Sequence, residues 1–411
     1  MAFKRLAIKR WQQFEEVELE FHPRLTILAG ANGAGKTTLL RFLARHFGWS
    51  FSSLATPRVA KSGGLRYVFG TFFGLKPDGS DGRVVGSISY STGRTSSIRL
   101  PEPADSIAYE LTIDGPETTA GIFVSSHRPE FRYQRVEQLP LRVRPWRQDA
   151  YSSINDALRR SNSGGGGHPV SYHMKEILIG LAVFGFGSEV VEPDPEARRL
   201  YEQFQDVLRV VLPPSLGFER LTIRDRAEVV LQTRTGEFIL DAVSGGVAAV
   251  IELAWQLFMY QPPEGSEFVV VIDEPENHLH PAMQRVLMPN FLRAFPKAQF
   301  IIATHSPFIV ASDKISSVYA LRYTPDRRVV SDRLEGANKS GTANDILREV
   351  LDVEVSSPAW VEDSFERILG KFAKENLTPA TARRLRSELT EAGLERLVPG
   401  ALVRLAEDQS K

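Results

Sequence analysis

A glycine-rich loop between an apolar strand and a helix is the sequence feature that most constrains the fold. The apolar run Leu25–Ala29 stops at a glycine, and the pattern G-x-x-x-x-G-K-T occupies Gly30–Thr37. After this loop, leucines and phenylalanines recur at helical spacing. Glycines let backbone N–H groups turn inward around phosphate oxygens, and the N-terminus of the following helix adds partial positive charge. The loop therefore predicts a phosphate site in a P-loop α/β fold.

Each polar group of this loop has a chemistry that its position predicts. Lys36 is expected to neutralise the β- and γ-phosphates of a nucleotide, and Thr37 to offer its hydroxyl to Mg²⁺. The alternative is a glycine-rich turn with a surface lysine, but that turn requires neither a strand before it nor a helix after it. The other residues expected to contact the nucleotide are Asn32, Gly33, Ala34, Gly35 and Thr38.

Two further apolar strands end in polar residues. Asp273 and Glu274 follow the run Phe268–Ile272, and His305 comes shortly after the run Phe300–Ala303. Because the carboxyl ends of parallel strands meet at one edge of a sheet, we expect these side chains beside the phosphate loop. Asp273 is expected to hold Mg²⁺ through water, Glu274 to polarise the attacking water, and His305 to hydrogen-bond the γ-phosphate. Each residue alone also fits a structural role at a strand end.

Another helix opens after a serine and two glycines. Ser244 is a good N-cap, and Gly245 and Gly246 expose backbone N–H groups, so this helix end is a candidate anion site. Taken alone, the same residues describe an ordinary capped helix.

The order of these motifs resembles that of ABC-type ATPases. The segments Ile272–Pro281 (IDEPENHLHP) and Ala303–Pro307 (ATHSP) are similar to the OLD/RecF-like branch, which is related to SMC and recombination-repair heads. The resemblance implies two ATP molecules with Mg²⁺ held between two chains, with Ser244–Gly246 of one chain on the γ-phosphate bound at Lys36 of the other. It also implies an interface-crossing loop and a glutamine at the Mg²⁺ site; the candidates are Asn277, Leu279 and His280 for the loop and Gln134 for the glutamine.

Two observations qualify the resemblance. Val247 stands where related proteins carry Gln or Glu, which leaves the strength of the contact to the second chain open. A metal cluster of His278, His280 and His305 is a second interpretation, and we rank it lower because the family pattern already accounts for all three histidines.

Composition excludes several classes of protein. The chain has 411 residues, 42% of them hydrophobic, and 50 basic against 50 acidic residues, so bulk positive charge does not bind nucleic acid. The lack of cysteine excludes a Cys nucleophile and fits a reducing cytoplasm, and no apolar stretch is long enough to cross a membrane.

The expected fold class is α/β: a P-loop NTPase with an ABC-type head, an antiparallel β subdomain and an inserted helical lobe. We expect residues 1–126 to hold the phosphate loop and the β subdomain, and residues 127–215 to form the mostly helical lobe. Residues 216–340 would then complete the ATPase lobe, and residues 341–411 would form a helical tail.

The expected activity is hydrolysis of ATP to ADP and phosphate in a homodimer or larger oligomer. By resemblance to antiphage-defence ATPases of the Septu, PARIS and retron kinds, turnover would drive or gate a DNA-related or defence complex. The effector, such as a nuclease, would be a separate protein, because residues 341–411 are too few for a Toprim nuclease domain. The alternative function is a slow-hydrolysing scaffold or sensor that holds and releases a partner protein.

An arginine-rich stretch leaves nucleic-acid binding open. Such a cluster either contacts phosphates of nucleic acid or forms an ordinary solvated or salt-bridged face. Its members are Arg128, Arg132, Arg135, Arg142, Arg144, Arg147, Arg159 and Arg160.

Overall fold

The computed structural model divides the chain into two units, Met1–Asp352 and Val353–Lys411. The described residues are 2–59, 65–68, 84–101, 107–128, 131–139, 145–162, 167–262, 266–334, 343–351, 359–373, 375 and 378–408.

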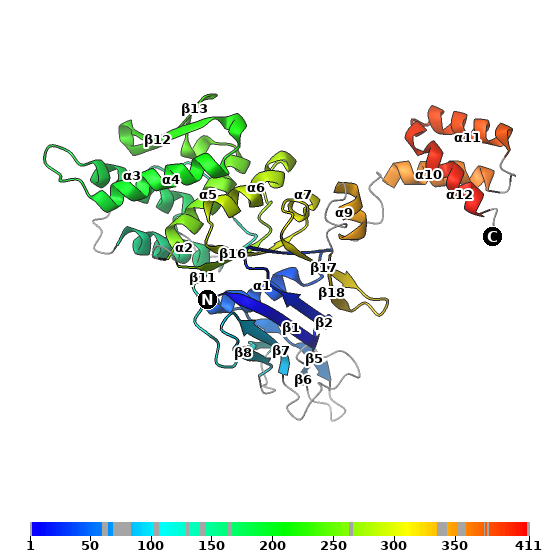
Figure 1. The fold of residues 1–411 in the computed structure, drawn as a ribbon, viewed down its shortest axis with the longest axis horizontal. Coiled ribbons are helices and arrows are strands. Elements are labelled where there is room, and N and C mark those ends of the chain that lie inside the picture. The colour runs from blue at the N-terminus through cyan, green and yellow to red at the C-terminus, as the bar shows by residue number, and fades with distance from the viewer. Residues whose placement is uncertain are drawn as a thin grey trace. The chain divides into compact units, whose positions relative to one another are not determined.

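An 11-stranded sheet forms the centre of the first unit (Figure 1). One half of it consists of neighbouring parallel strands, whose register pairs Ile272 with Ile302 and Ala303 with Leu28. The prediction that the three apolar motif strands share a parallel sheet is therefore confirmed. In sheet order the parallel strands are β11 (Gly121–Val124), β15 (Phe268–Asp273), β16 (Ala298–Thr304), β3 (Leu25–Gly30) and β17 (Ser317–Tyr323).

The other half of this sheet is mainly antiparallel. Its first strand is antiparallel to β17 and parallel to the next strand, after which every pair is antiparallel. The expected antiparallel strands thus extend the central sheet. In sheet order they are β18 (Val329–Arg333), β2 (Phe14–Glu20), β1 (Phe3–Trp11), β7 (Val84–Tyr90), β8 (Thr95–Arg99) and β10 (Thr112–Ile113).

One expected strand is divided in two. The run Ala108–Ile113 forms β9 (Ala108–Tyr109), which pairs with β4 (Ser53–Leu54), and β10, which pairs with β8. Between the two short strands Arg45 donates to the carbonyl of Leu111 at 2.9 Å, so a side chain there replaces a neighbouring strand. A separate hairpin pairs β5 (Thr56–Val59) with β6 (Leu65–Val68).

Capping residues mark where the helices begin. Asp194 accepts hydrogen bonds from the N–H groups of Glu196 and Ala197, and Pro195 fits the first turn of the helix that follows. Among the described residues, the helices of the first unit are α1 (Lys36–Ala44), α2 (Trp146–Asn162), α3 (Val170–Phe186), α4 (Pro195–Val211), α5 (Gly245–Tyr260), α6 (Pro281–Ala294), α7 (Pro307–Val310) and α9 (Ala343–Glu349).

The parallel strands are buried on both faces, which explains their continuous apolar runs. Ile27 joins the core formed with α2–α6, whereas the next residue, Leu28, joins the core that contains residues of α1. Ile302 and Ile301 of β16 divide between the two cores in the same way. Figure 1 shows α3–α6 on one side of these strands and α1, β1 and β2 on the other.

A small antiparallel sheet precedes α5. Its strands are β12 (Phe218–Arg224), β13 (Glu228–Thr233) and β14 (Gly236–Ile239), and a short 3-10 turn over Leu240–Ala242 joins the last strand to the helix.

The second unit consists of helices around a core of its own. Leu369, Phe372, Leu385 and Leu389 are buried in it. Within the described part of the whole chain, the helices lack the length and apolar character needed to cross a membrane. The helices of this unit are α10 (Ala359–Phe372), α11 (Pro379–Glu391) and α12 (Val398–Asp408).

Candidate functional site

The phosphate loop is shaped by glycines in left-handed conformations. Gly33 has φ 81° and Gly35 has φ 90°, values that favour glycine. A Cβ atom at Gly35 would also lie 2.4 Å from the ring of Phe14. Both the backbone conformation and the lack of space therefore require glycine at position 35. The loop packs against Phe14 of β2, and α1 begins directly after it, at Lys36.

Lys36 is a buried cation at the centre of this loop. Its Nζ donates to the carbonyls of Gly30 at 2.7 Å and Ala31 at 3.0 Å. Burial lowers the pKa of Lys36 to about 8, while the attraction of Glu274 and Asp273 opposes that shift. The ammonium group is thus charged at neutral pH, and among the described residues its hydrogen-bond partners are carbonyl oxygens and a histidine nitrogen, so an anion would be a better partner.

Thr37 and Asp273 meet across α1 and β15. The Thr37 hydroxyl donates to Asp273 Oδ2 at 2.8 Å. Asp273 is 3% exposed, and burial raises the pKa of its carboxyl group. A hydroxyl and a buried carboxylate are hard oxygen donors of the kind that Mg²⁺ prefers, and a cation would offset the unfavourable buried charge. The residues present therefore fit Mg²⁺.

A series of close polar contacts connects Lys36 to Glu274 through His305. Lys36 Nζ lies 3.3 Å from His305 Nδ1, and His305 Nε2 lies 3.3 Å from Glu274 Oε1. Because an ammonium group only donates, Nδ1 is the acceptor and the ring proton lies on Nε2, toward the carboxylate. Burial and then the charge of Lys36 lower the pKa of His305, which keeps the ring neutral at neutral pH.

Glu276 holds the His305 turn and was not predicted as a site residue. Its Oε1 accepts from Thr304 Oγ1 at 2.5 Å, from the His305 N–H at 2.8 Å and from the Ser306 N–H at 3.2 Å. These bonds fix where the backbone of His305 lies. Its place two residues after Glu274 is a signal in the sequence, but its partners are 28 to 30 residues away along the chain.

Asn277 orients the second oxygen of Glu274. Its Nδ2 donates to Glu274 Oε2 at 3.0 Å and to the carbonyl of Ser126 at 3.0 Å. The sequence placed Asn277 only in an interface loop, whereas the structure gives it a contact with the expected catalytic carboxylate.

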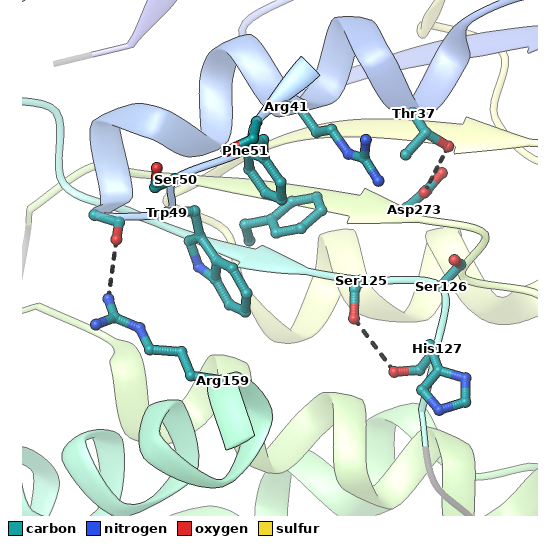
Figure 2. A pocket seen from close by; sticks show the side chains of 13 residues that line it. Thr37, Arg41, Trp49, Ser50, Phe51, Ser125, Ser126, His127, Arg159 and Asp273 are labelled. Atoms are coloured by element: carbon teal, nitrogen blue, oxygen red, sulfur yellow. Dashed lines mark hydrogen bonds between the residues drawn. The ribbon is translucent and has the colours of Figure 1, made fainter. Parts of the chain in front are cut away.

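The structure does not bring Gln134 to the Thr37–Asp273 pair. The side-chain nitrogen Nε2 of Gln134 lies 2.7 Å from His168 Nδ1, and the backbone carbonyl of Gln134 accepts from Lys175. Strand β11, for which the sequence shows no clear pattern, instead positions the residues that follow it. Ser125, Ser126 and His127 line a cavity of about 640 Å³ together with Thr37 and Asp273 (Figure 2).

The Ser244–Gly246 turn lies on the surface at the start of α5. Ser244 and Gly245 are exposed, and the Ser244 side chain makes no capping hydrogen bond. A Cβ atom at Gly246 would meet the carbonyl of His278 at 3.2 Å, so the turn lies beside the loop after β15. Within the described residues, no hydrogen bond or ion pair connects Ser244 with Lys36 of the same chain.

The arginine-rich stretch is not one free basic face. Arg128 is buried, and Arg147 donates to the carbonyl of Phe258 and lies over its ring. Arg159 donates to the carbonyl of Gly48 at 3.0 Å (Figure 2). Arg142 and Arg144 lie outside the described residues.

The histidines of the motifs do not form a metal cluster. His280 Nδ1 accepts from the Ala282 N–H at 3.2 Å and so caps α6, while His305 belongs to the Lys36–Glu274 series. Among the described residues, no group of His, Asp and Glu has the arrangement of a metal site. The Thr37–Asp273 pair is outside that class because it uses a hydroxyl.

Two family models match the chain. One, described as "AAA domain, putative AbiEii toxin, Type IV TA system", covers residues 173–311, and the other, described as "AAA domain", covers residues 5–73. The first match includes the Asp273–Glu274 strand end and His305, and the second includes the phosphate loop.

The chain is also similar to several curated proteins. The chain is 23% identical to a Septu protein PtuA of Bacillus thuringiensis over 92% of both chains. It is 25% identical to an OLD nuclease of Thermus scotoductus, over 83% of this chain and 66% of that one. It is also 25% identical to the Retron Ec83 "probable ATPase" of Escherichia coli, over 39% of this chain and 29% of that one.

The fold and the site define a P-loop ATPase. Two segments of the chain match AAA domain models, and the chain is similar in sequence to a Septu protein PtuA, an OLD nuclease and a retron probable ATPase.

Proposed function

We propose that the chain hydrolyses ATP in a site shared by two copies and that turnover gates a separate effector protein in antiphage defence. The single observation that carries the proposal is the series from Lys36 through His305 to Glu274, beside the Thr37–Asp273 pair. The Septu, OLD and retron relatives support the defence context.

In the proposed reaction the phosphate loop binds the phosphates of ATP, and Glu274 directs the attack of water. Lys36 leaves the carbonyls of Gly30 and Ala31 for the β- and γ-phosphates of the substrate, ATP. Glu274 orients a water molecule whose oxygen attacks the γ-phosphorus in line as the bond to the β,γ-bridging oxygen breaks and ADP leaves. His305 holds its Nε2 proton toward Glu274 and fixes the direction of that carboxylate.

Thr37 and Asp273 are the residues that would hold Mg²⁺. When bound, Mg²⁺ supplies charge stabilisation for the phosphate oxygens. The two side chains are 2.8 Å apart. Thr37 lies in the first turn of α1, directly after the phosphate loop, and Asp273 lies at the C-terminal end of β15.

A second copy would complete the site. The N-terminus of α5 at Ser244–Gly246 is exposed at Ser244 and Gly245, and no anion of the described residues is bound to its first N–H groups. A γ-phosphate held by another copy is a suitable partner, so we infer a homodimer or a larger oligomer. The effector, which we propose to be a nuclease, would be a different chain.

Steady-state turnover of the full chain tests this function. Glu274→Gln should lower Mg²⁺-dependent ATP turnover by at least about 100-fold and leave ATP affinity intact, because the carboxylate acts on water and not on binding. Glu267→Gln is a matched control: Glu267 is exposed just before the same strand, and turnover should stay within about twofold of wild type.

Two outcomes decide between the functions. Turnover by Glu274→Gln at the wild-type rate would refute hydrolysis at this site. Addition of double-stranded DNA separates a DNA-driven ATPase, whose turnover rises, from a slow scaffold, whose turnover does not change while ATP stabilises its oligomers.

A further inference from the structure

Arg128 is a buried cation that the ATPase motifs leave unassigned. It follows β11 by a few residues and is 5% exposed, and burial lowers the pKa of its guanidinium group. Its Nη2 donates to the carbonyl oxygens of Glu274 at 2.9 Å and Pro275 at 3.3 Å. Burying a charge is unfavourable unless it is well paired, so the contacts that Arg128 makes identify what it is there to hold.

The carbonyls that Arg128 holds belong to a strained turn. Glu274 has φ 50°, a left-handed backbone conformation that costs a non-glycine residue about 1–2 kcal/mol. The Glu274 N–H donates to the carbonyl of Ala303 at 2.9 Å, and the Glu274 carbonyl accepts from Arg128. Because the backbone conformation sets where the carboxylate points, Arg128 helps to direct it toward His305.

Glu252 connects the same arginine to α5. This carboxylate lies in the middle of α5, is 2% exposed and accepts from Gln256 Nε2 at 3.1 Å. Arg128 and Glu252 attract each other, although they do not form a direct ion pair within the described residues. Nε and Nη1 of Arg128 have no hydrogen-bond partner there either, so the guanidinium has donors free to follow a shift of α5.

We propose that Arg128 is a positioning residue for Glu274 and that, through Glu252, it makes the direction of Glu274 depend on the position of α5. This rests on the proposed function, in which the N-terminus of α5 contacts the nucleotide bound by the second copy. When the α5 N-terminus of one chain contacts the nucleotide bound by the other, Glu274 of the first chain would change direction. Each copy would then hydrolyse its own ATP in response to the occupancy of the other site.

Kinetics of four variants test the proposal. Arg128→Met should lower kcat by about 10- to 100-fold with ATP-analogue affinity within about twofold of wild type, because the arginine acts on Glu274 and not on binding. Arg128→Lys, which keeps the charge, should recover part of kcat, and Glu252→Gln should lower kcat by about 3- to 10-fold. Arg132→Met is the control, since Arg132 is exposed in the same segment, and its kcat should not change.

The affinity probe is a fluorescent, non-hydrolysable ATP analogue, and circular dichroism reports folding. If Arg128→Met does not fold, Glu252→Gln decides alone. The effects of Arg128→Met and Glu252→Gln should be non-additive when combined, because the two residues act as one unit. An unchanged kcat in Arg128→Met or in Glu252→Gln, or a fall in kcat matched by an equal loss of affinity, would overturn the proposal. Failure of the proposed function is seen separately, in Glu274→Gln.

Discussion

Buried carboxylates around the site differ in how well they are satisfied. Glu276 Oε1 accepts hydrogen bonds from Thr304, His305 and Ser306. Glu252 has Gln256 as its hydrogen-bond donor and a guanidinium beyond ion-pair distance. Burial raises the pKa of Glu252 to about 7. The loss of water around the carboxylate therefore disfavours its charged form more than the attraction of Arg128 favours it.

Glu252→Gln is therefore predicted to stabilise the protein at alkaline pH. The folded pKa of about 7 exceeds the ordinary 4.5, so the folded state binds the extra proton and wild-type stability falls as pH rises from about 4.5 through 7. Above pH 7 the ionised Glu252 should cost about 3 kcal/mol, which Gln avoids. Urea unfolding at pH 5 and pH 8 measures this, with Glu219→Gln on an exposed carboxylate as the control. The same pH dependence in both variants would contradict it.

Sequence motifs identify residues whose role depends on neighbours along the chain. Lys36 and Thr37 belong to one loop, and Glu274 follows an apolar strand, so their types and spacing were enough to select them. Arg128 and Glu276 act through partners that are distant in sequence; Arg128, for example, reaches a carbonyl 146 residues away. Only the folded chain shows such contacts. For the same reason the prediction of Gln134 as a Mg²⁺ ligand does not agree with the structure, in which Ser125–His127, after β11, lie beside Thr37 and Asp273.

At the scale of elements, burial on both faces made some strands easy to recognise. β3, β15 and β16 are mostly apolar, and all their residues are buried, including the polar Thr26, Asp273, Gln299 and Thr304. β11 has only four residues, and its partner β15 lies far along the chain. Short strands with distant partners leave little signal in a single sequence, so β11 and the divided Ala108–Ile113 run were beyond prediction.

The carbonyl groups at the C-terminal end of α6 are hydrogen-bonded by Arg24, the residue directly before β3. Arg24 donates to the carbonyls of Leu292 at 2.6 Å and Ala298 at 2.7 Å, and also to those of Phe295 and Pro296. The Leu292 and Phe295 carbonyls lie at the C-terminal end of α6, where a helix carries partial negative charge and has few partners of its own, while Ala298 begins β16.

Arg24→Met should destabilise the first unit by about 2–3 kcal/mol, because it leaves several carbonyls unsatisfied and removes a charged donor. Urea unfolding followed by circular dichroism measures the change. Arg285→Met, on an exposed position of α6, should change stability by less than about 0.5 kcal/mol. Equal stability of the two variants would show that α6 does not need this arginine.

At the scale of the whole molecule, the residues that we propose to share one nucleotide lie at two separate places. Lys36 and Glu274 lie at the edge of the central sheet, and Ser244 lies exposed at the start of α5. The sequence order of these motifs suggested that two copies share each nucleotide. The antiparallel strands that extend the central sheet were expected as a subdomain, but their continuity with it follows from strand pairing that no motif records.

The most direct measurement of a shared site is ATP turnover by a mixture of two inactive variants. Lys36→Ala removes the phosphate-binding cation, and Ser244→Arg blocks the α5 N-terminus, so neither variant alone contains an intact shared site. In a dimer of one chain of each kind, the intact Lys36 meets the intact Ser244 at one of the two sites. Random mixing should restore at most about a quarter of wild-type turnover, because the chain with intact Lys36 carries the blocked α5, and it should restore tight binding of a non-hydrolysable ATP analogue at that site. A mixture that neither hydrolyses ATP nor binds the analogue better than the two variants measured separately would contradict the shared site.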